Sequence, residues 1–367
     1  MATLITPGER VEGLGGYVVK PVIKKFKAQS QSEGAGFVIR RPIGRTLSDE
    51  EADPFLLLDE LGPVSYAKGE FPGAPWHPHR GFDTVMYMLQ GEGKHQDSMG
   101  NSGILRAGDV QWMTAGSGIE HDEGRDHPGG ILHGFQMWIN LPSHLKMSDP
   151  SYQDIPSDDI PVVEIKDGLK AKILAGTCHR INAIIQTQVE CQYLDFQITL
   201  EGKSSDGLEY THIVPEKMTT GIVFVYHGTG LFGANDIECT DGDTILLGPG
   251  DSLRFKCVTK LDNRKKKLYT EDLRFLFLAG KPLKEPIERH GPFVMNTREE
   301  LLIAFKEYQQ GTFIKKKGIM LKKTPTVLGE KDEGEERTGE ETNSDDNGND
   351  NNNIKKKNSD DSGSNKE

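Results

Sequence analysis

Short runs of alternating apolar residues, each closed by Gly, Pro or Asp, set the strongest limit on how this chain can fold. From Gly36 onward such runs recur at roughly 8–12-residue intervals, a spacing typical of antiparallel sandwiches and barrels. They include GFVIRRPIG, DPFLLLDEL, FDTVMYMLQG, GILRAGDVQWMTAG and ILHGFQMWINLP. The pattern therefore predicts an all-β fold.

A Pro- and Asp-rich passage at 148–161 interrupts this pattern, and we interpret it as a linker. Strands resume beyond it in GIVFVYHGTGLFG, DTILLGPGDSLRFKC and LRFLFLAG. On both sides a strand ends in a Gly turn, and a Gly-Asp turn follows about 15–20 residues later, a weak internal repeat that suggests duplication. We predict a polar N-terminal lead over 1–30, one β domain over 31–150 and a second over 165–312.

One helix is predicted after the β regions. Thr297 and Glu300 have the spacing of a capping box, and Gly311 provides a helix stop. Beyond it, residues 324–367 are rich in Asp, Asn, Ser, Lys and Glu and carry −7 of the chain's net charge of −12. Such a segment buries too little apolar surface to offset its ordering entropy, so we predict a disordered acidic tail.

Composition excludes several classes of function. A mildly acidic body is unsuited to direct nucleic-acid binding, which needs cations facing phosphates. No run approaches the ~18 apolar residues of a membrane span, and the first residues lack the apolar region of a signal peptide. The four cysteines form no CxxC pair. We expect an intracellular protein, in the nucleus, the cytoplasm or both, that acts as a monomer away from membranes.

Two pairs of potential metal ligands are the sharpest local feature. His77 and His79 flank a proline, and in a strand positions i and i+2 point to the same face. About 40 residues later, His121 and Glu123 repeat this spacing. Three imidazoles and a carboxylate without a thiolate suit non-haem iron, with manganese, nickel or copper as alternatives. An isolated HPH is more often a surface turn, but a second pair favours a metal site.

These residues also carry a family resemblance. The segment WHPHRGFDTVMYMLQGEGKHQDSMGNSGILRAGDVQWMTAGSGIEHDE resembles the first cupin domain of the pirin family. The likeness continues through GFQMWINLP and KMSDPSYQ and returns in RHGPFVMNT, so that it spans roughly residues 30–312. It implies two tandem cupin barrels of jelly-roll topology, with the short helix and the acidic tail after them.

The resemblance also implies a ligand set. The family's HPHRG motif matches at His77 and His79, and its GIxHxE motif matches at His121 and Glu123, which implies one iron, Fe²⁺ or Fe³⁺, per chain in the first barrel. Asp83 stands where the family usually has glutamate. We expect Asp83 either to accept a hydrogen bond from His79 or to face outward from its strand.

Neighbouring side chains and the second barrel complete the predicted site. Large apolar residues near the ligands should form the barrel core, and some of them should line the metal pocket; alternation alone does not say which. They are Trp76, Trp112, Trp138, Met86, Met88, Met113, Phe82 and Phe135. The second barrel lacks an HxH pair, and its isolated His212 and His227 favour structural roles. We expect that barrel to bind no metal.

Two functions follow from the resemblance. One is a quercetin 2,3-dioxygenase type of activity on a flavonol-like substrate, in which Glu123 is also catalytic and takes the proton from the substrate's 3-hydroxyl. The alternative is an iron- and redox-dependent nuclear cofactor that binds a transcription factor without turnover.

Overall fold

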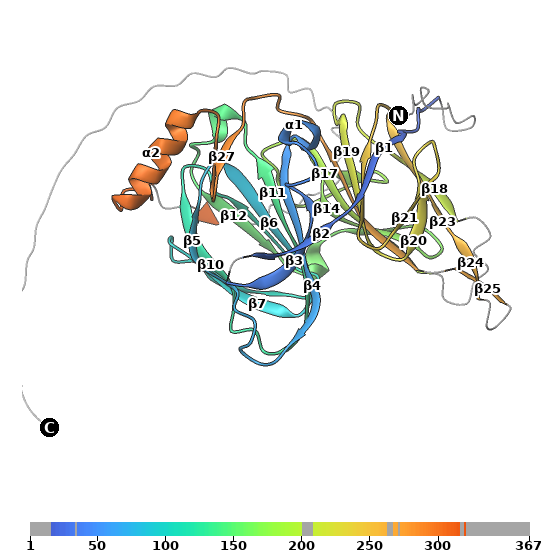
Figure 1. Ribbon diagram of the computed structural model, residues 1–367, viewed down its shortest axis with the longest axis horizontal. Coiled ribbons are helices and arrows are strands. Elements are labelled where there is room, and N and C mark those ends of the chain that lie inside the picture. The colour runs from blue at the N-terminus through green and yellow to red at the C-terminus, as the bar shows by residue number, and fades with distance from the viewer. Residues whose placement is uncertain are drawn as a thin grey trace, which may run out of the picture. The chain divides into compact units, whose positions relative to one another are not determined.

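Residues 16–33, 35–199, 208–262, 267–270, 272–315 and 319–320 are described by a computed structural model (Figure 1). The predicted acidic tail, 324–367, lies outside the described residues, as does the first half of the predicted lead.

The first barrel consists of two sheets. The larger has the strand order β2-β3-β4-β11-β6-β9-β12-β29, and the smaller has the order β5-β10-β7-β8. The strands are β2 (Gln29–Glu33), β3 (Phe37–Ile43), β4 (Phe55–Tyr66), β5 (Ala74–His79), β6 (Phe82–Gln90), β7 (Glu92–Asp97), β8 (Ser102–Arg106), β9 (Val110–Thr114), β10 (Ile119–Arg125), β11 (Gly130–Asn140), β12 (Ser151–Ile155) and β29 (Ile319–Met320).

The second barrel repeats this arrangement. Its larger sheet has the order β1-β22-β19-β26-β17-β14-β13, and its smaller sheet has the order β18-β23-β20-β21. These strands are β1 (Val22–Lys27), β13 (Val162–Lys166), β14 (Leu169–Ala175), β17 (Cys191–Ile198), β18 (Glu209–Ile213), β19 (Thr220–His227), β20 (Thr229–Phe232), β21 (Ile237–Thr240), β22 (Asp243–Leu247), β23 (Ser252–Cys257) and β26 (Leu273–Gly280).

Small elements complete the chain. Three hairpins pair β15 (Thr177–Cys178) with β16 (Ile181–Asn182), β24 (Thr259–Asp262) with β25 (Lys267–Thr270), and β27 (Glu288–His290) with β28 (Phe293–Met295). The helices are α1 (Asp49–Ala52) and α2 (Arg298–Gln309), and two short 3-10 turns are η1 (Ser143–Leu145) and η2 (Ser157–Asp159). The capping box predicted for α2 is present, since Thr297 caps Glu300 N and the Glu300 side chain accepts from Thr297 N. The all-β fold of two successive barrels with a short C-terminal helix is therefore confirmed.

The two larger sheets share one apolar core. Phe135 and Trp112 of the first barrel belong to the same buried cluster as Tyr193 and Phe224 of the second. Inside it, the Asp195 carboxylate accepts hydrogen bonds from the hydroxyls of Tyr87, at 2.8 Å, and Tyr226, at 2.6 Å. Because both faces of β6 are covered, most of its residues are buried instead of alternating between buried and exposed.

Each barrel also takes a segment from the far end of the chain. Within the predicted lead, β1 pairs with β22 of the second barrel, and Figure 1 shows it (blue) among yellow strands. The C-terminal segment joins the first barrel in turn, because Phe293 forms an isolated β-bridge with Arg80. Figure 1 shows β27 and α2 (orange) on the side of the first barrel. The interpretation of 148–161 as a linker was wrong in part, because β12 pairs with β9 inside the first barrel.

Candidate metal centre

Antiparallel pairing of β5 with β10 brings the predicted histidines together. His77 and His79 occupy alternate positions of β5, and in the register His121 lies opposite His77 while Ile119 lies opposite His79. Directly opposed residues point to the same face of a sheet. The three imidazoles therefore gather on one face of the smaller sheet.

The three rings are in mutual contact. Ring centroids are 4.6 Å apart for His77 and His79, 4.4 Å for His77 and His121, and 4.9 Å for His79 and His121. One ring nitrogen from each lies within 4.8 Å of the others. In the part of the chain that the structure describes, this is the one group of three or more His, Cys, Asp or Glu side chains close enough to hold a metal ion.

The hydrogen bonding of the imidazoles fits a metal. His77 Nδ1 donates to the Pro75 carbonyl at 2.8 Å, which leaves its Nε2 as the free nitrogen. His79 Nδ1 and His121 Nε2 are buried and have no hydrogen-bond partner among the described residues. Burial, with neighbouring imidazoles second, lowers the pKa of His79 and of His121 well below 6.5. Neutral imidazoles with unshared nitrogens are the form that binds a cation.

Glu123 lies beside this group. A register irregularity between His121 and Glu123 interrupts strict alternation in β10, and Glu123 Oε1 lies 3.8 Å from His121 Nδ1. Burial is the main reason that the pKa of Glu123 is raised. The carboxylate is within reach of a metal held by the histidines, and its role as the fourth ligand remains our prediction.

An open cleft of about 880 Å³ leads to the histidines. One wall is formed by Trp76 and Trp138, and the opposite end of the chain supplies another through Arg289, His290 and Pro292. Two of the tryptophans near the ligands therefore line the pocket, whereas Trp112 is core. The contribution of residues 289–292 could not be found by local pattern, because they lie more than 160 positions after His121.

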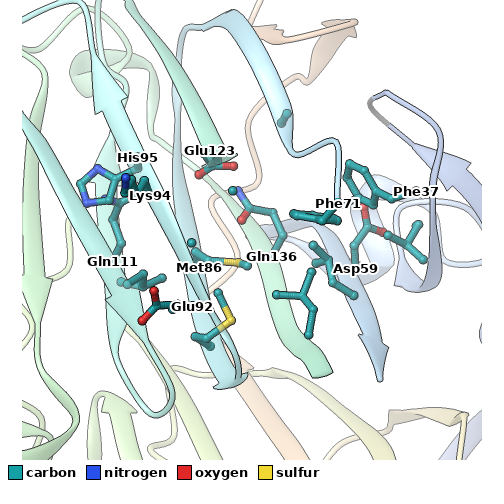
Figure 2. Close-up of a pocket in the computed structure, with 18 of the residues that line it drawn as sticks. Phe37, Asp59, Phe71, Met86, Glu92, Lys94, His95, Gln111, Glu123 and Gln136 are labelled. Carbon is teal, nitrogen blue, oxygen red and sulfur yellow. The ribbon is translucent and has the colours of Figure 1, made fainter. Parts of the chain in front are cut away.

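A smaller apolar cavity of about 100 Å³ lies behind the cleft (Figure 2). Its lining includes Phe37, Phe71, Met86 and Met88. The cleft and the cavity share several residues, of which the polar ones are Glu33, Asp59, Glu123 and Gln136. Glu123 therefore borders both the histidine-lined cleft and an apolar chamber.

Asp59 is a site residue that the sequence analysis missed. The Arg41 guanidinium holds its carboxylate through two hydrogen bonds of 2.7 Å, from Nε and Nη2. Burial nevertheless raises the pKa of Asp59 to about 6. The sequence did contain a signal, because Asp59 ends the apolar run DPFLLLDEL. Burying an unpaired carboxylate costs folding free energy, so an acid in such a run is expected to have a partner.

Neither role expected for Asp83 is correct. The residue is fully buried and so does not face outward. Its Oδ2 accepts a hydrogen bond of 2.9 Å from Trp112 Nε1, and its Oδ1 has no hydrogen-bond partner in the described chain, so it does not hold His79. Burial raises the pKa of Asp83 to about 7. Its function is to anchor a core tryptophan.

Arg80, which follows His79, connects the site to α2 and to Phe313. The buried guanidinium of Arg80 donates from Nε to the Ser117 carbonyl at 2.7 Å and from Nη2 to the Phe313 carbonyl at 3.2 Å. It also lies 2.7 Å from a carboxylate oxygen of Glu307 on α2 and 4.4 Å from the ring centroid of Phe313. The arginine of the HPHRG motif thus has a structural role.

We predict one metal ion per chain. The first barrel has a group of three histidines that can hold a metal ion. In the second barrel His212 is buried, and its ring nitrogen Nε2 is hydrogen-bonded to Gln192 at 3.2 Å. Elemental analysis of gently purified protein should give a stoichiometry near one. Two ions per chain, or none, would contradict this.

Acidification should release the metal steeply, beginning below about pH 6. Binding requires neutral imidazoles, so metal affinity falls as pH decreases, and the lowered pKa of His79 and His121 moves that competition below the ordinary histidine range. Bound metal should be followed against pH beside circular dichroism. A one-proton slope centred near pH 4 would show that the carboxylate controls release instead.

Comparisons with known proteins agree with the fold of two successive barrels. The model of the Pirin family matches residues 36–139, and that of the Pirin C-terminal cupin domain matches residues 199–314. A pirin-like protein of Solanum lycopersicum is 41% identical over 79% of this chain and 91% of its own length, and Pirin of Homo sapiens is 37% identical over 79% and 92%. The crystal structure of quercetin 2,3-dioxygenase from Acinetobacter baumannii superimposes with a TM-score of 0.70 at 32% identity, covering 81% of this chain and 99% of that one.

Among the described residues, neither helix has the length and apolar character that a membrane crossing requires.

Proposed function

The chain belongs to the pirin family, and from that membership we propose that it is a dioxygenase of the quercetin 2,3-dioxygenase type. In this proposal one iron is held by His77, His79, His121 and Glu123. The substrate is a flavonol-like molecule that enters through the cleft beside the histidines.

The observation that carries the proposal is the position of Glu123. Its carboxylate adjoins the imidazole group at 3.8 Å from His121 and borders both the cleft and the apolar cavity. The likeness to a quercetin 2,3-dioxygenase structure at 32% identity supports a substrate of this class. A cleft of about 880 Å³ lies within the usual range for small-molecule sites.

Glu123 would act as the general base. Because burial raises its pKa, the carboxylate is a stronger base than an exposed glutamate and is suited to take the proton of a phenolic hydroxyl placed beside it. His77, His79 and His121 would hold a ferrous ion, which would supply Lewis-acid polarisation of the substrate and one-electron chemistry toward dioxygen.

Apolar side chains would orient the rings of the substrate. Trp76 and Trp138 line the cleft, and Phe37 lines both cleft and cavity, so a flat aromatic ligand can stack while its hydroxyls face the histidines. Gln136 is the amide shared by both spaces (Figure 2). It can donate to one oxygen of the ligand and accept from another.

Replacing Glu123 with glutamine should lower quercetin turnover per bound iron by roughly 100-fold or more, the range expected when a general base is lost. The test is oxygen uptake and quercetin depletion by iron-loaded protein, with iron measured in the same samples. Glu92→Gln is the matched control, since Glu92 also lines the inner cavity (Figure 2). Equal turnover in wild type and Glu123→Gln would remove Glu123 from the chemistry.

A second function, metal-dependent binding of a protein partner such as a transcription factor, has its own support. Arg80 directly follows the proposed ligand His79 and contacts Glu307 on the surface helix α2. A change at the metal could therefore alter an exposed surface. Redox-dependent partner binding without oxygen uptake would favour this function over the enzyme.

A further inference from the structure

A second large cavity lies away from the histidines, where the two barrels meet. Its volume is about 580 Å³, and both larger sheets line it. The first barrel contributes residues of β3, β4, β6 and β11, and the second contributes residues of β13, β14, β17, β19 and β26. None of the residues named above for the metal cleft lines it.

Four donor side chains form a continuous row on the second barrel's side. In the strand register His227 lies opposite Arg274, Arg274 opposite Gln197, and Gln197 opposite Lys170. Opposed residues on paired strands point to the same face, and all four line the cavity. Neighbouring strands are about 4.8 Å apart, so the row is evenly spaced along one wall. Gln197 Nε2 already donates to Asp195 Oδ2 at 2.6 Å, so Lys170 and Arg274 are the charged donors of the row.

The next row inward forms a rigid floor. Lys172 is buried, and its Nζ donates to the Gly108 carbonyl at 2.6 Å and to Ser157 Oγ at 2.9 Å. Beside it, the rings of Tyr87 and Tyr226 line the cavity while their hydroxyls donate to Asp195. The floor is therefore polar, aromatic and held by hydrogen bonds from both barrels.

The cations of this wall lack the carboxylate partners found elsewhere. Lys25 and Lys27 pair with Asp243, and Arg254 pairs with Asp236. Among the described residues, Lys170 and Arg274 have no ion pair or hydrogen bond from their side chains and are exposed to solvent.

The acids near the cavity form no ion pair with Lys170 or Arg274 among the described residues. Glu164 of β13 lies opposite Lys170 in the strand register, but it is exposed and does not line the cavity. Asp241 is the one acid that lines it, and Arg40 pairs with it at 2.9 Å. Arg40 also bonds Glu60 at 2.6 Å, and Glu60 in turn lies 2.9 Å from His133 Nε2. Two buried acids, Glu60 and Asp195, thus lie beneath the lining and are hydrogen-bonded to residues of the lining. Neither pairs with Lys170 or Arg274, so the wall keeps excess positive charge in a chain of net charge −12.

We propose that this inter-barrel cavity binds a small organic anion that carries two phosphate or carboxylate groups. Lys170 and Arg274 lie two strands apart, about 10 Å between backbones, and their long side chains can each hold one anionic group. Tyr87, Tyr226 and Leu89 provide the surface for the body of the ligand. The volume suits a metabolite-sized molecule.

Isothermal titration of the full-length, metal-loaded protein tests this site. The probes are fructose 1,6-bisphosphate for phosphates and succinate for carboxylates, at constant ionic strength adjusted with chloride, and bound metal is measured after each titration. The test variant is Lys170→Ala with Arg274→Ala. The control, Arg106→Ala with Lys281→Ala, removes the same charge from exposed positions outside this cavity.

The proposal expects saturable binding of at least one probe near one equivalent, with a Kd below about 1 mM. Affinity should fall tenfold or more in the test variant and stay within twofold in the control. The preferred probe then identifies the anionic group. Absence of saturable binding, or equal loss of affinity in both double variants, would overturn the proposal and show only general charge attraction.

Discussion

Replacing His79 with alanine is expected to remove the bound metal, and any dioxygenase turnover with it, while both barrels stay folded. The imidazole is one of three that meet within 4.8 Å, and two ligands cannot define the same site. Metal affinity should fall by more than the 10–100-fold typical of outer-shell changes. Metal content after gel filtration should drop from about one per chain to less than about a tenth.

The fold should survive because two effects of this substitution oppose each other. Removing a buried side chain leaves a cavity at a cost on the order of 2 kcal/mol. It also removes the buried, unpartnered Nδ1, whose burial costs roughly 1–3 kcal/mol in the metal-free protein. The thermal midpoint of the metal-free variant should therefore lie within a few degrees of that of metal-free wild type.

His212→Ala is the matched control for this experiment. His212 is equally buried, but it lies in the second barrel and is bonded to Gln192. Its loss should lower stability while leaving metal content unchanged. If His212→Ala loses metal as His79→Ala does, the effect is global unfolding and not loss of a ligand.

Among substitutions that add a single methyl group near the site, Gly81→Ala is expected to destabilise the protein most. Gly81 has φ of +88°, and an added Cβ would lie 1.9 Å from the Val294 carbonyl oxygen. The left-handed backbone alone costs about 1–2 kcal/mol. The clash adds more, because Lys146 Nζ ties the Gly81 and Val294 carbonyls together at 3.0 and 3.1 Å.

A loss of about 3 kcal/mol should lower the thermal midpoint by roughly 6–12 °C. Limited proteolysis should also cut the segment 288–315 faster, since it would be displaced from Arg80 and Gly81. Gly291→Ala is the control: it also has positive φ, +54°, but its added Cβ would meet nothing within 4 Å. Similar midpoints for the two variants would show that backbone strain, and not the Val294 contact, sets the cost.

Local patterns explain why much of this protein could be predicted from sequence. His77 and His79 follow the two-residue repeat of one strand, and the pairing of β5 with β10 brings His121 beside them. The capping box at Thr297 is likewise local, and it is present as predicted.

What could not be predicted depends on contacts between distant positions. Strand β1 joins the second barrel across more than 200 residues, and nothing in VIKKFK specifies β22 as its partner. Asp83 was misjudged for the same reason, because its partner Trp112 comes from another strand. Alternation assigns a residue to a face but does not identify the side chain it meets there.

The exchange of end segments between the barrels has a consequence for biosynthesis. The first barrel contains the histidines, but its Arg80 has no partner at Phe313 until the ribosome has made nearly the whole body of the chain. Likewise β1 is synthesised early and must wait for β22. Neither barrel can therefore be completed during translation independently of the other. Metal loading into a fully walled site should therefore follow synthesis of the segment that ends at Phe313. Expressing residues 31–150 alone would yield a barrel that lacks part of its metal cleft.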